Sequence, residues 1–293
     1  MARKISLVVI DPQRSFCATV DAASQQQIHD GELCVPGAWE DMVRLSAMID
    51  RLSDSIHMIF PTMDSHYLLH IAHPIWFRDT AGNHPDPFTS MRIESGAIIG
   101  SQLTGSGSFQ DIGEFTTTDP TKLRWTINYL EKLLAGKRYP HMIWPPHCII
   151  GTPGHTFVEP FAESLMRWEM KHLKAAFRWT KGSNIGCEHF SAIRAEVPDP
   201  GDPSTQLDAR FVQQVMEADE ILLSGEALSH CLANTVRDLA NEFRASGDDL
   251  IKKCILLEDA TSSVPGLEQL GTDFVAEMKV RGMRVTTTVD YMS

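Results

Sequence analysis

The sequence predicts an α/β fold of three layers, in which helices cover both faces of a central, mostly parallel sheet. Short apolar runs that end in an acid or a glycine, as in KISLVVID and DEILLSGEA, indicate buried strands. Segments with helical periodicity, such as 38–52 and 230–243, lie between these runs. Strands that alternate with helices form right-handed βαβ units, and such units build a parallel sheet covered on both sides.

Strands are expected in five runs, which in chain order are KISLVVID, SIHMIFPTMD, DEILLSGEA, KKCILLEDAT and GMRVTTTV. A further apolar stretch ends at the lysine of FRWTKGSN. In parallel sheets of this kind, ligands bind beyond the carboxyl ends of the strands. The polar residues that follow the runs are therefore candidate site residues, namely Asp11, Asp64, Lys181, the turn at 225–231 and Asp259.

We expect a single domain over residues 1–293, interrupted by an insertion or lid at about 68–139. The inserted segment is rich in Gly, Ser, Thr and Pro, as in GNHPDPFTS and SQLTGSGSF, and the run DPTKLRWTINYLEKLL is its one expected helix. A long segment with so little regular structure is typical of a functional lid or an oligomer contact. We therefore place it on the catalytic face and expect a homo-oligomer.

Charge and composition exclude several classes of partner. The formal net charge is −12, so the chain lacks the basic footprint that nucleic acid or an anionic membrane surface requires. No apolar stretch is long enough to span a membrane, and the N-terminal apolar run ends at Asp11 and Pro12, too early for a signal peptide. We expect a cytoplasmic protein with reduced cysteines that acts on a neutral or cationic small molecule.

Cys231 is the candidate nucleophile. It lies in ILLSGEALSHCLANT, at the expected first turn of a helix, where the dipole and unpaired N–H groups favour an anion and lower a thiol pKa. A buried cysteine that only packs the helix against the sheet is an equally good interpretation of this position. Asp11 and Lys181 favour the first interpretation, because they offer a base and a cation at neighbouring strand ends.

A metal site is predicted from Asp64, His66 and His147. The first two stand two residues apart on an extended segment, so their side chains lie on the same side and can bind one ion. A carboxylate with two imidazoles suits zinc, and also manganese or iron. His70 and His73 are expected to be core or surface residues, with His70 the better reserve ligand.

The stretch HMIWPPHCIIGTPGHTF contains too many prolines for a helix or a central strand. Its two consecutive prolines fix the backbone between Trp144 and His147, so the indole and the imidazole leave in restricted directions. This arrangement could aim a ring and a ligand at a common point.

The ordered motifs resemble those of the nicotinamidases among the isochorismatase-like cysteine hydrolases. They extend from Asp11 to Asp259 and are DPQRSF, GELCVPG, Thr-x-Asp-x-His, WPPHCIIGTPG, Lys-Gly and Gly-x-Ala-x-x-x-Cys. Each motif is weak alone, but the ordered set is specific, and WPPHCIIGTPG is its most specific member.

The resemblance implies hydrolysis of nicotinamide or a related carboxamide to the acid and ammonia through a thioester, as in pyridine nucleotide salvage in NAD metabolism. By position it makes Cys231 the nucleophile, Asp11 the base and Lys181 the third member of the triad. By the same comparison the metal ligands are Asp64, His66 and His147. The residues around the substrate ring are Phe16 and Trp144. The oxyanion donors are the backbone N–H groups of Ala227 and Cys231. It also implies a cis peptide at Glu226-Ala227.

Four residues depart from the family pattern: Ser15, Ser65, Tyr67 and Glu226. Two alternatives to a metal-dependent nicotinamidase therefore stay open. One is an amidohydrolase of the same fold that acts on a carbamoyl or ureido substrate without metal. The other is a catalytically silent binding protein, which the retention of the cysteine, lysine and aspartate disfavours.

Overall fold

The computed structural model describes residues 3–20, 27–29, 31–104, 108–245 and 250–293. Its main sheet has six strands in the order β10-β4-β1-β11-β12-β13, and every neighbouring pair is parallel. The strands are β1 (Ile5–Ile10), β4 (Ile56–Asp64), β10 (Trp179–Lys181), β11 (Glu220–Gly225), β12 (Cys254–Leu257) and β13 (Arg284–Thr286). Each predicted run contains one of these strands, so the expected parallel sheet is confirmed.

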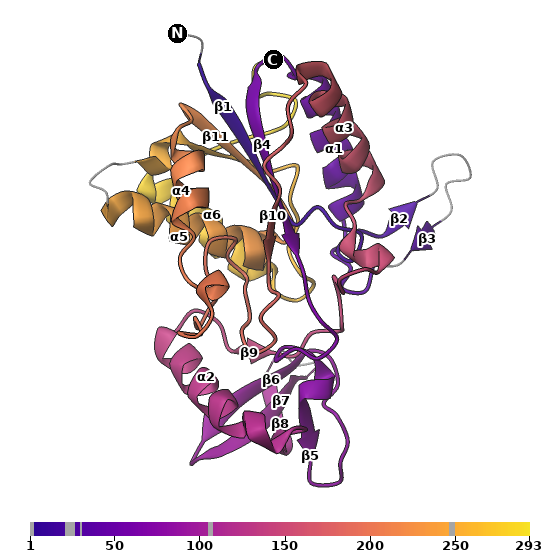
Figure 1. Ribbon diagram of the computed structural model, residues 1–293, viewed down its shortest axis with the longest axis vertical. Coiled ribbons are helices and arrows are strands. Elements are labelled where there is room, and N and C mark those ends of the chain that lie inside the picture. The colour runs from indigo at the N-terminus through magenta and orange to yellow at the C-terminus, as the bar shows by residue number, and fades with distance from the viewer. Residues whose placement is uncertain (1–2, 21–26, 30, 105–107, 246–249) are drawn as a thin grey trace.

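Helices cover both faces of this sheet (Figure 1). On one side lie α1 (Ala38–Arg51) and α3 (Glu159–His172), and on the other α4 (Ala209–Met216), α5 (Ala233–Ala245) and α6 (Glu268–Arg281). In α1 the buried residues Met42, Leu45 and Ile49 recur every three to four positions, which gives the helix one apolar face. Within the described residues, no helix combines the length and the apolar character needed to cross a bilayer.

Smaller elements connect the layers. A hairpin is formed by β2 (Thr19–Val20) and β3 (Gln27–His29). Short 3₁₀ turns occur at Pro74–Trp76, Pro120–Lys122, Pro153–His155, Pro203–Thr205 and Leu250–Lys253. Four of them begin with proline, whose fixed φ suits the first position of a helical turn.

The insertion contains far more regular structure than its sequence indicates. It holds most of a second, antiparallel sheet of order β5-β8-β7-β6-β9, with strands Phe77–Asp79, Phe109–Thr117, Ala97–Leu103, Thr89–Glu94 and His141–Met142. The expectation of a single helix with little else is therefore wrong. The signal was missed because β8 is mostly exposed on both faces, so it lacks the apolar run of a buried strand. Residues 105–107, within the SQLTGSGSF stretch, lie outside the described residues.

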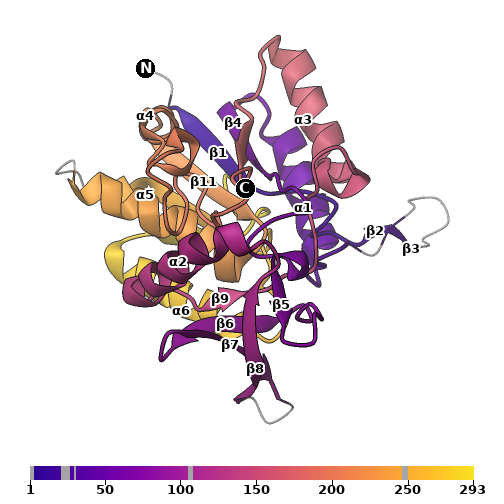
Figure 2. The ribbon, with the colours of Figure 1, turned by 60° about the horizontal axis from the view of Figure 1, so that its bottom comes forward.

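The one helix expected in the insertion is present as α2 (Leu123–Gly136). It packs on the second sheet through Tyr129, Leu130 and Leu133, and forms with Trp76 and Phe77 a hydrophobic cluster separate from the main core. Figure 2 shows α2 lying across this sheet, and Figure 1 shows the sheet beyond the carboxyl ends of the main strands. The insertion is thus next to the edge where the candidate site residues were expected.

Gly225, the last residue of β11, is expected to be irreplaceable. Its φ is +107°, and an added Cβ would lie 2.0 Å from the carbonyl oxygen of Ile10 in the neighbouring strand. Because the Ile10 oxygen is a backbone atom within the sheet and cannot move aside, Gly225→Ala should lower the free energy of unfolding by about 3 kcal/mol or more. Gly136→Ala in α2 is the matched control, since nothing lies within 4 Å of its added Cβ. Urea denaturation that ranks the two variants equally would contradict this assignment.

Candidate active site

The strand order brings the predicted catalytic residues to one edge. Strands β10, β4, β1 and β11 are consecutive neighbours, and Lys181, the last residue of β10, pairs in register with Asp64, the last of β4. Asp11 directly follows β1, and Cys231 lies in a π-helical turn, Leu228–Leu232, that leads from β11 into α5. Parallel strands present their carboxyl ends on the same side, so four residues far apart in sequence converge.

Lys181 is at the centre of this cluster. Its Nζ lies 2.9 Å from Asp11 Oδ2 and 3.1 Å from Asp64 Oδ1, and its side chain is fully buried. The ammonium also donates to the carbonyl of His189 at 2.9 Å and lies 3.6 Å from Cys231 Sγ. Burial opposes the charge, but the two carboxylates hold the pKa of Lys181 well above its usual range. The lysine therefore carries a buried positive charge that joins the candidate nucleophile to both acids.

Asp11 is placed to accept a proton. It is completely buried, its Oδ1 accepts a hydrogen bond from Thr62 Oγ1 at 2.6 Å, and its backbone N–H donates to the same hydroxyl. Burial raises the pKa of Asp11, although the nearby Lys181 ammonium opposes the shift. A carboxylate with a raised pKa is a stronger base than an exposed one.

The predicted lowering of the Cys231 thiol pKa is wrong. Burial raises the pKa of this thiol well above its usual range, and the Lys181 ammonium only partly offsets the effect. The helix dipole favoured an anion at this position, but the loss of hydration in the closed site is the larger effect. A protonated thiol needs a base at the moment of attack, which is the role that Asp11 can fill.

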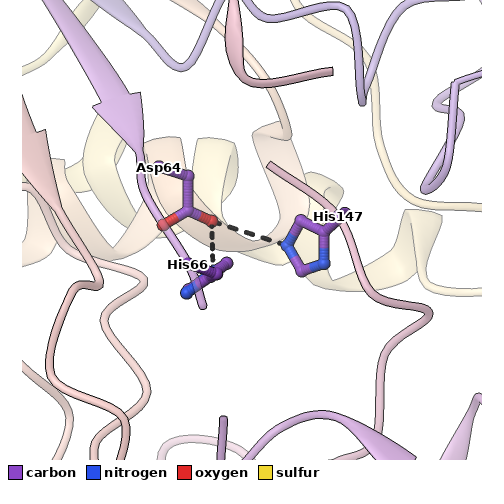
Figure 3. A group of neighbouring side chains, drawn as sticks. All are labelled: Asp64, His66 and His147. Atoms are coloured by element: carbon purple, nitrogen blue, oxygen red, sulfur yellow. Dashed lines mark hydrogen bonds and ion pairs between the residues drawn. The ribbon is translucent and has the colours of Figure 1, made fainter. Parts of the chain in front are cut away.

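Asp64, His66 and His147 meet beside the lysine (Figure 3). Asp64 Oδ2 lies 2.9 Å from His66 Nε2 and 3.5 Å from His147 Nε2. One ligand atom from each of the three residues lies within 4.8 Å of the others, and all three side chains are buried. Of these candidate ligands, Asp64 ends β4, His66 follows two residues later, and His147 comes from the WPPH stretch.

The chemistry of the three donors fits a divalent metal. His66 Nδ1 lies 3.0 Å from the carbonyl of Gly182, and His147 Nδ1 lies 2.8 Å from the carbonyl of Pro145. A carbonyl can only accept, so in the neutral rings both Nδ1 atoms carry the proton and both Nε2 lone pairs face the Asp64 carboxylate. Converging lone pairs of this kind call for a cation, and imidazoles oriented through the other ring nitrogen are typical of metal ligands.

Gly182 explains the Lys-Gly motif. Its φ is +85°, and an added Cβ would lie 2.7 Å from Asp64 Oδ1 and 2.8 Å from His66 Cε1. Only glycine therefore lets the backbone after Lys181 pass this close to Asp64 and His66. The carbonyl of Gly182 in turn orients the His66 ring.

The two predicted ring residues lie at the site but in different surroundings. Phe16 packs edge-on against His147, with ring centroids 5.5 Å apart. Trp144 instead belongs to an aromatic cluster with Phe190 at 6.4 Å and His230 at 5.4 Å. Sequence reasoning missed both partners. The sequence could have indicated His230 as a residue near the site, because it directly precedes Cys231. No motif near Phe190 indicates that it lies there.

A buried segment behind Lys181 was also missed. His189 provides the carbonyl that accepts from the lysine, and the wholly buried Glu188 accepts the N–H of His189 at 3.0 Å. Burial raises the pKa of Glu188, and its Oε2 has no hydrogen-bond partner among the described residues. Nothing in the sequence around these residues indicated that they approach the site.

Three of the four departures from the family pattern have identifiable contacts, and the fourth is exposed. Ser15 Oγ accepts the N–H of Cys148 at 2.8 Å, and Ser65 Oγ is hydrogen bonded to His155 Nε2 at 2.8 Å. Tyr67 is exposed, with 52% of its surface accessible. The peptide between Glu226 and Ala227 is cis, as the resemblance implied, and Glu226 Oε2 accepts the N–H of Ser262.

Asp259 does not belong to the site, although it follows a predicted strand. Its two carboxylate oxygens accept the backbone N–H and the hydroxyl of Thr288, each at 2.7 Å. It therefore ties the end of β12 to the segment after β13 and serves the fold. Its strand is one place farther along the sheet than β11, which puts it too far from Lys181.

Comparisons with solved structures agree with the fold. Neither a protein-family model nor a curated protein matches the chain. Among solved structures, the yeast nicotinamidase bound to the inhibitor nicotinaldehyde matches with a TM-score of 0.59 at 18% identity, covering 97% of this chain and 99% of that one. A nicotinamidase/pyrazinamidase from Acinetobacter baumanii gives 0.60 at 18% identity, with 98% and 97% covered.

The pyrazinamidase of Pyrococcus horikoshii in complex with zinc matches with a TM-score of 0.50 at 16% identity, and 97% of this chain and 98% of that one are covered. These likenesses extend over nearly the whole length of every chain compared. The chain therefore has the fold of the nicotinamidases and pyrazinamidases, the fold that its sequence motifs predicted.

Proposed function

We propose that this protein is an amidohydrolase that converts nicotinamide, or a closely related pyridine carboxamide, to the acid and ammonia. The observation that carries the proposal is the buried contact of Lys181 with Asp11, Asp64 and Cys231. A thiol, a base and a cation in one enclosed site are the groups that covalent amide hydrolysis needs. The nicotinamidase fold supports the same reaction class.

In the proposed reaction Cys231 Sγ attacks the amide carbonyl carbon while Asp11 takes the thiol proton. Lys181 lies between the two and stabilises the negative charge as it moves from the carboxylate to the sulfur. The backbone N–H groups of Ala227 and Cys231 are the proposed donors to the carbonyl oxygen as it becomes an oxyanion. Asp11 then returns the proton to the leaving nitrogen, ammonia departs, and a thioester remains.

Water completes the cycle. Asp11 accepts a proton from the attacking water, the bond between sulfur and carbon breaks, and Asp11 returns the proton to the departing sulfur, so the acid leaves and the Cys231 thiol is restored. Burial favours this role, since it raises the pKa of Asp11 and lets the carboxylate take protons readily.

The pyridine ring is proposed to lie between Phe16 and Trp144, beside the metal ligands. A divalent metal held by Asp64, His66 and His147, most simply zinc, would bind the ring nitrogen and so orient the amide toward Cys231. Support comes from the converging Nε2 atoms of the two histidines. It also comes from two structures with the same fold, one bound to nicotinaldehyde and one to zinc.

The second sheet is proposed to form a wall or lid over this pocket. Phe88, in the turn before β6, packs edge-on against Trp144 with ring centroids 5.9 Å apart. The backbone of Trp144 is also bonded to the carbonyl of Ala72, at the start of the insertion. The insertion therefore touches the residue that is proposed to contact the substrate ring.

The deciding experiment measures ammonia release from nicotinamide, pyrazinamide, benzamide and a ureido acid, before and after chelation. Nicotinamide should be hydrolysed, and metal removal should reduce its kcat/KM far more than that of benzamide, which has the same shape without the ring nitrogen. An equal fractional loss for both amides, or no loss for either, would contradict the metal assignment. Turnover of the ureido acid alone would move the protein to the metal-free class.

A further inference from the structure

His73 has the features of a metal ligand that its sequence position did not indicate. The residue is fully buried, and its Nδ1 lies 3.1 Å from the carbonyl of Leu68. Because the carbonyl can only accept, Nδ1 carries the proton and Nε2 keeps its lone pair. Among the described residues that Nε2 has no hydrogen-bond partner, although it is shielded from solvent.

The same pattern occurs in the two predicted histidine ligands. His66, His147 and His73 each donate Nδ1–H to a backbone carbonyl, from Gly182, Pro145 and Leu68 respectively. The ring of His73 is the neighbour of both others, with centroid separations of 5.5 Å to His66 and 5.7 Å to His147. The rings of His66 and His147 are themselves 4.9 Å apart, so the three imidazoles are mutual neighbours.

His70, the reserve ligand expected from the sequence, does not share this pattern. Its Nε2 lies 3.0 Å from the carbonyl of Cys187, and its Nδ1 accepts the backbone N–H of Ala72 at 3.2 Å. Both ring nitrogens are thus engaged by the protein, and neither has a lone pair left for an ion. The order expected for His70 and His73 is reversed.

We propose that His73 is a fourth protein ligand of the metal, through Nε2, together with Asp64, His66 and His147. A buried nitrogen without a hydrogen-bond partner is destabilising, and coordination would give this Nε2 a partner. The group whose ligand atoms lie within 4.8 Å of one another contains Asp64, His66 and His147 but not His73, so the His73 ring would move toward the other three when the ion binds. This inference rests on the metal assignment within the proposed function.

Two substitutions separate the nitrogens of His73. His73→Asn keeps an N–H near the position of Nδ1, which can still bond to Leu68, but removes the donor at Nε2. His73→Gln places an amide oxygen near Nε2 and so restores a donor atom. His84→Gln is the control, because the exposed His84 also has its Nδ1 within hydrogen-bond distance of a carbonyl, that of Phe77, but lies in the loop between β5 and β6.

The full-length protein is titrated with cobalt(II) and zinc(II), and affinity and the visible spectrum of bound cobalt are recorded. Loss of an outer-shell partner of a metal ligand commonly lowers metal affinity by about 10- to 100-fold, so the loss of a ligand in His73→Asn should lower it at least as much. It should also change the cobalt spectrum, which reports the ligand set, while His73→Gln recovers part of the affinity and His84→Gln matches the unaltered protein.

An unchanged cobalt spectrum in His73→Asn would overturn the proposal, whatever its affinity. A failure of the unaltered protein to bind either metal would overturn it together with the metal assignment. The two failures are distinguishable, because the first leaves the metal dependence of nicotinamide hydrolysis in place and the second does not.

Discussion

Replacing Cys231 with alanine is expected to abolish amide hydrolysis while leaving the fold intact. The thiol is the only protein group in the proposed reaction that forms a bond to the substrate carbon, so no neighbouring side chain can take its place. In the best-studied triad the loss of the nucleophile costs on the order of a million-fold in kcat. Ammonia release with saturating nicotinamide measures the effect, and thermal unfolding checks the fold.

Cys254→Ala is the matched control for this variant. Cys254 is also buried next to the sheet core, in β12, and burial raises its pKa to about 12. Its truncation should have little effect on turnover, because no base or cation of the site is near it. Activity above a few per cent in Cys231→Ala would rule out the covalent mechanism.

Replacing Lys181 with methionine should cost both activity and stability. The substitution keeps most of the side-chain volume but removes the charge that lies 2.9 Å from Asp11 and 3.1 Å from Asp64. Removing one partner of a buried ion pair typically costs about 3–5 kcal/mol, since a charge is left without compensation. Turnover should fall with it, because nothing then stabilises the charge on Cys231 and Asp11.

A second substitution separates the two losses. Adding Asp11→Asn to Lys181→Met removes one of the stranded charges, so the double variant should regain part of the stability in a urea titration. It should regain no activity, since the proposed base is also gone. Equal stability of the single and double variants would show that the lysine charge does not compensate Asp11.

The insertion shows where sequence patterns stop being informative. Its helix was predictable from periodicity, but β8 was not, because only its last residue is buried and its apolar residues do not alternate cleanly. The main strands were found because β1 and β11 are buried along their whole length and read as continuous apolar runs. Burial on both faces is thus what made a strand visible in the sequence.

Electrostatics show the same limit in the site. The position of Cys231 at a helix start was correct, yet the expected fall in the thiol pKa was wrong, because a sequence contains no measure of desolvation. The contact between Lys181 and Asp64 was likewise not anticipated. It depends on the registry of β10 with β4, which places the two residues opposite each other.

The sequence by itself determined the parallel sheet, the strand ends that present Asp11, Asp64 and Lys181, and the turn that presents Cys231, because periodicity and local turn chemistry are encoded within short segments. Only the tertiary structure decided which histidines keep a free Nε2. His70 and His73 differ by three positions, and the sequence favoured His70 as the reserve ligand, but His70 has both ring nitrogens bonded whereas His73 has one left unpaired. That difference arises from carbonyls that the fold brings near each ring, and no local pattern records it.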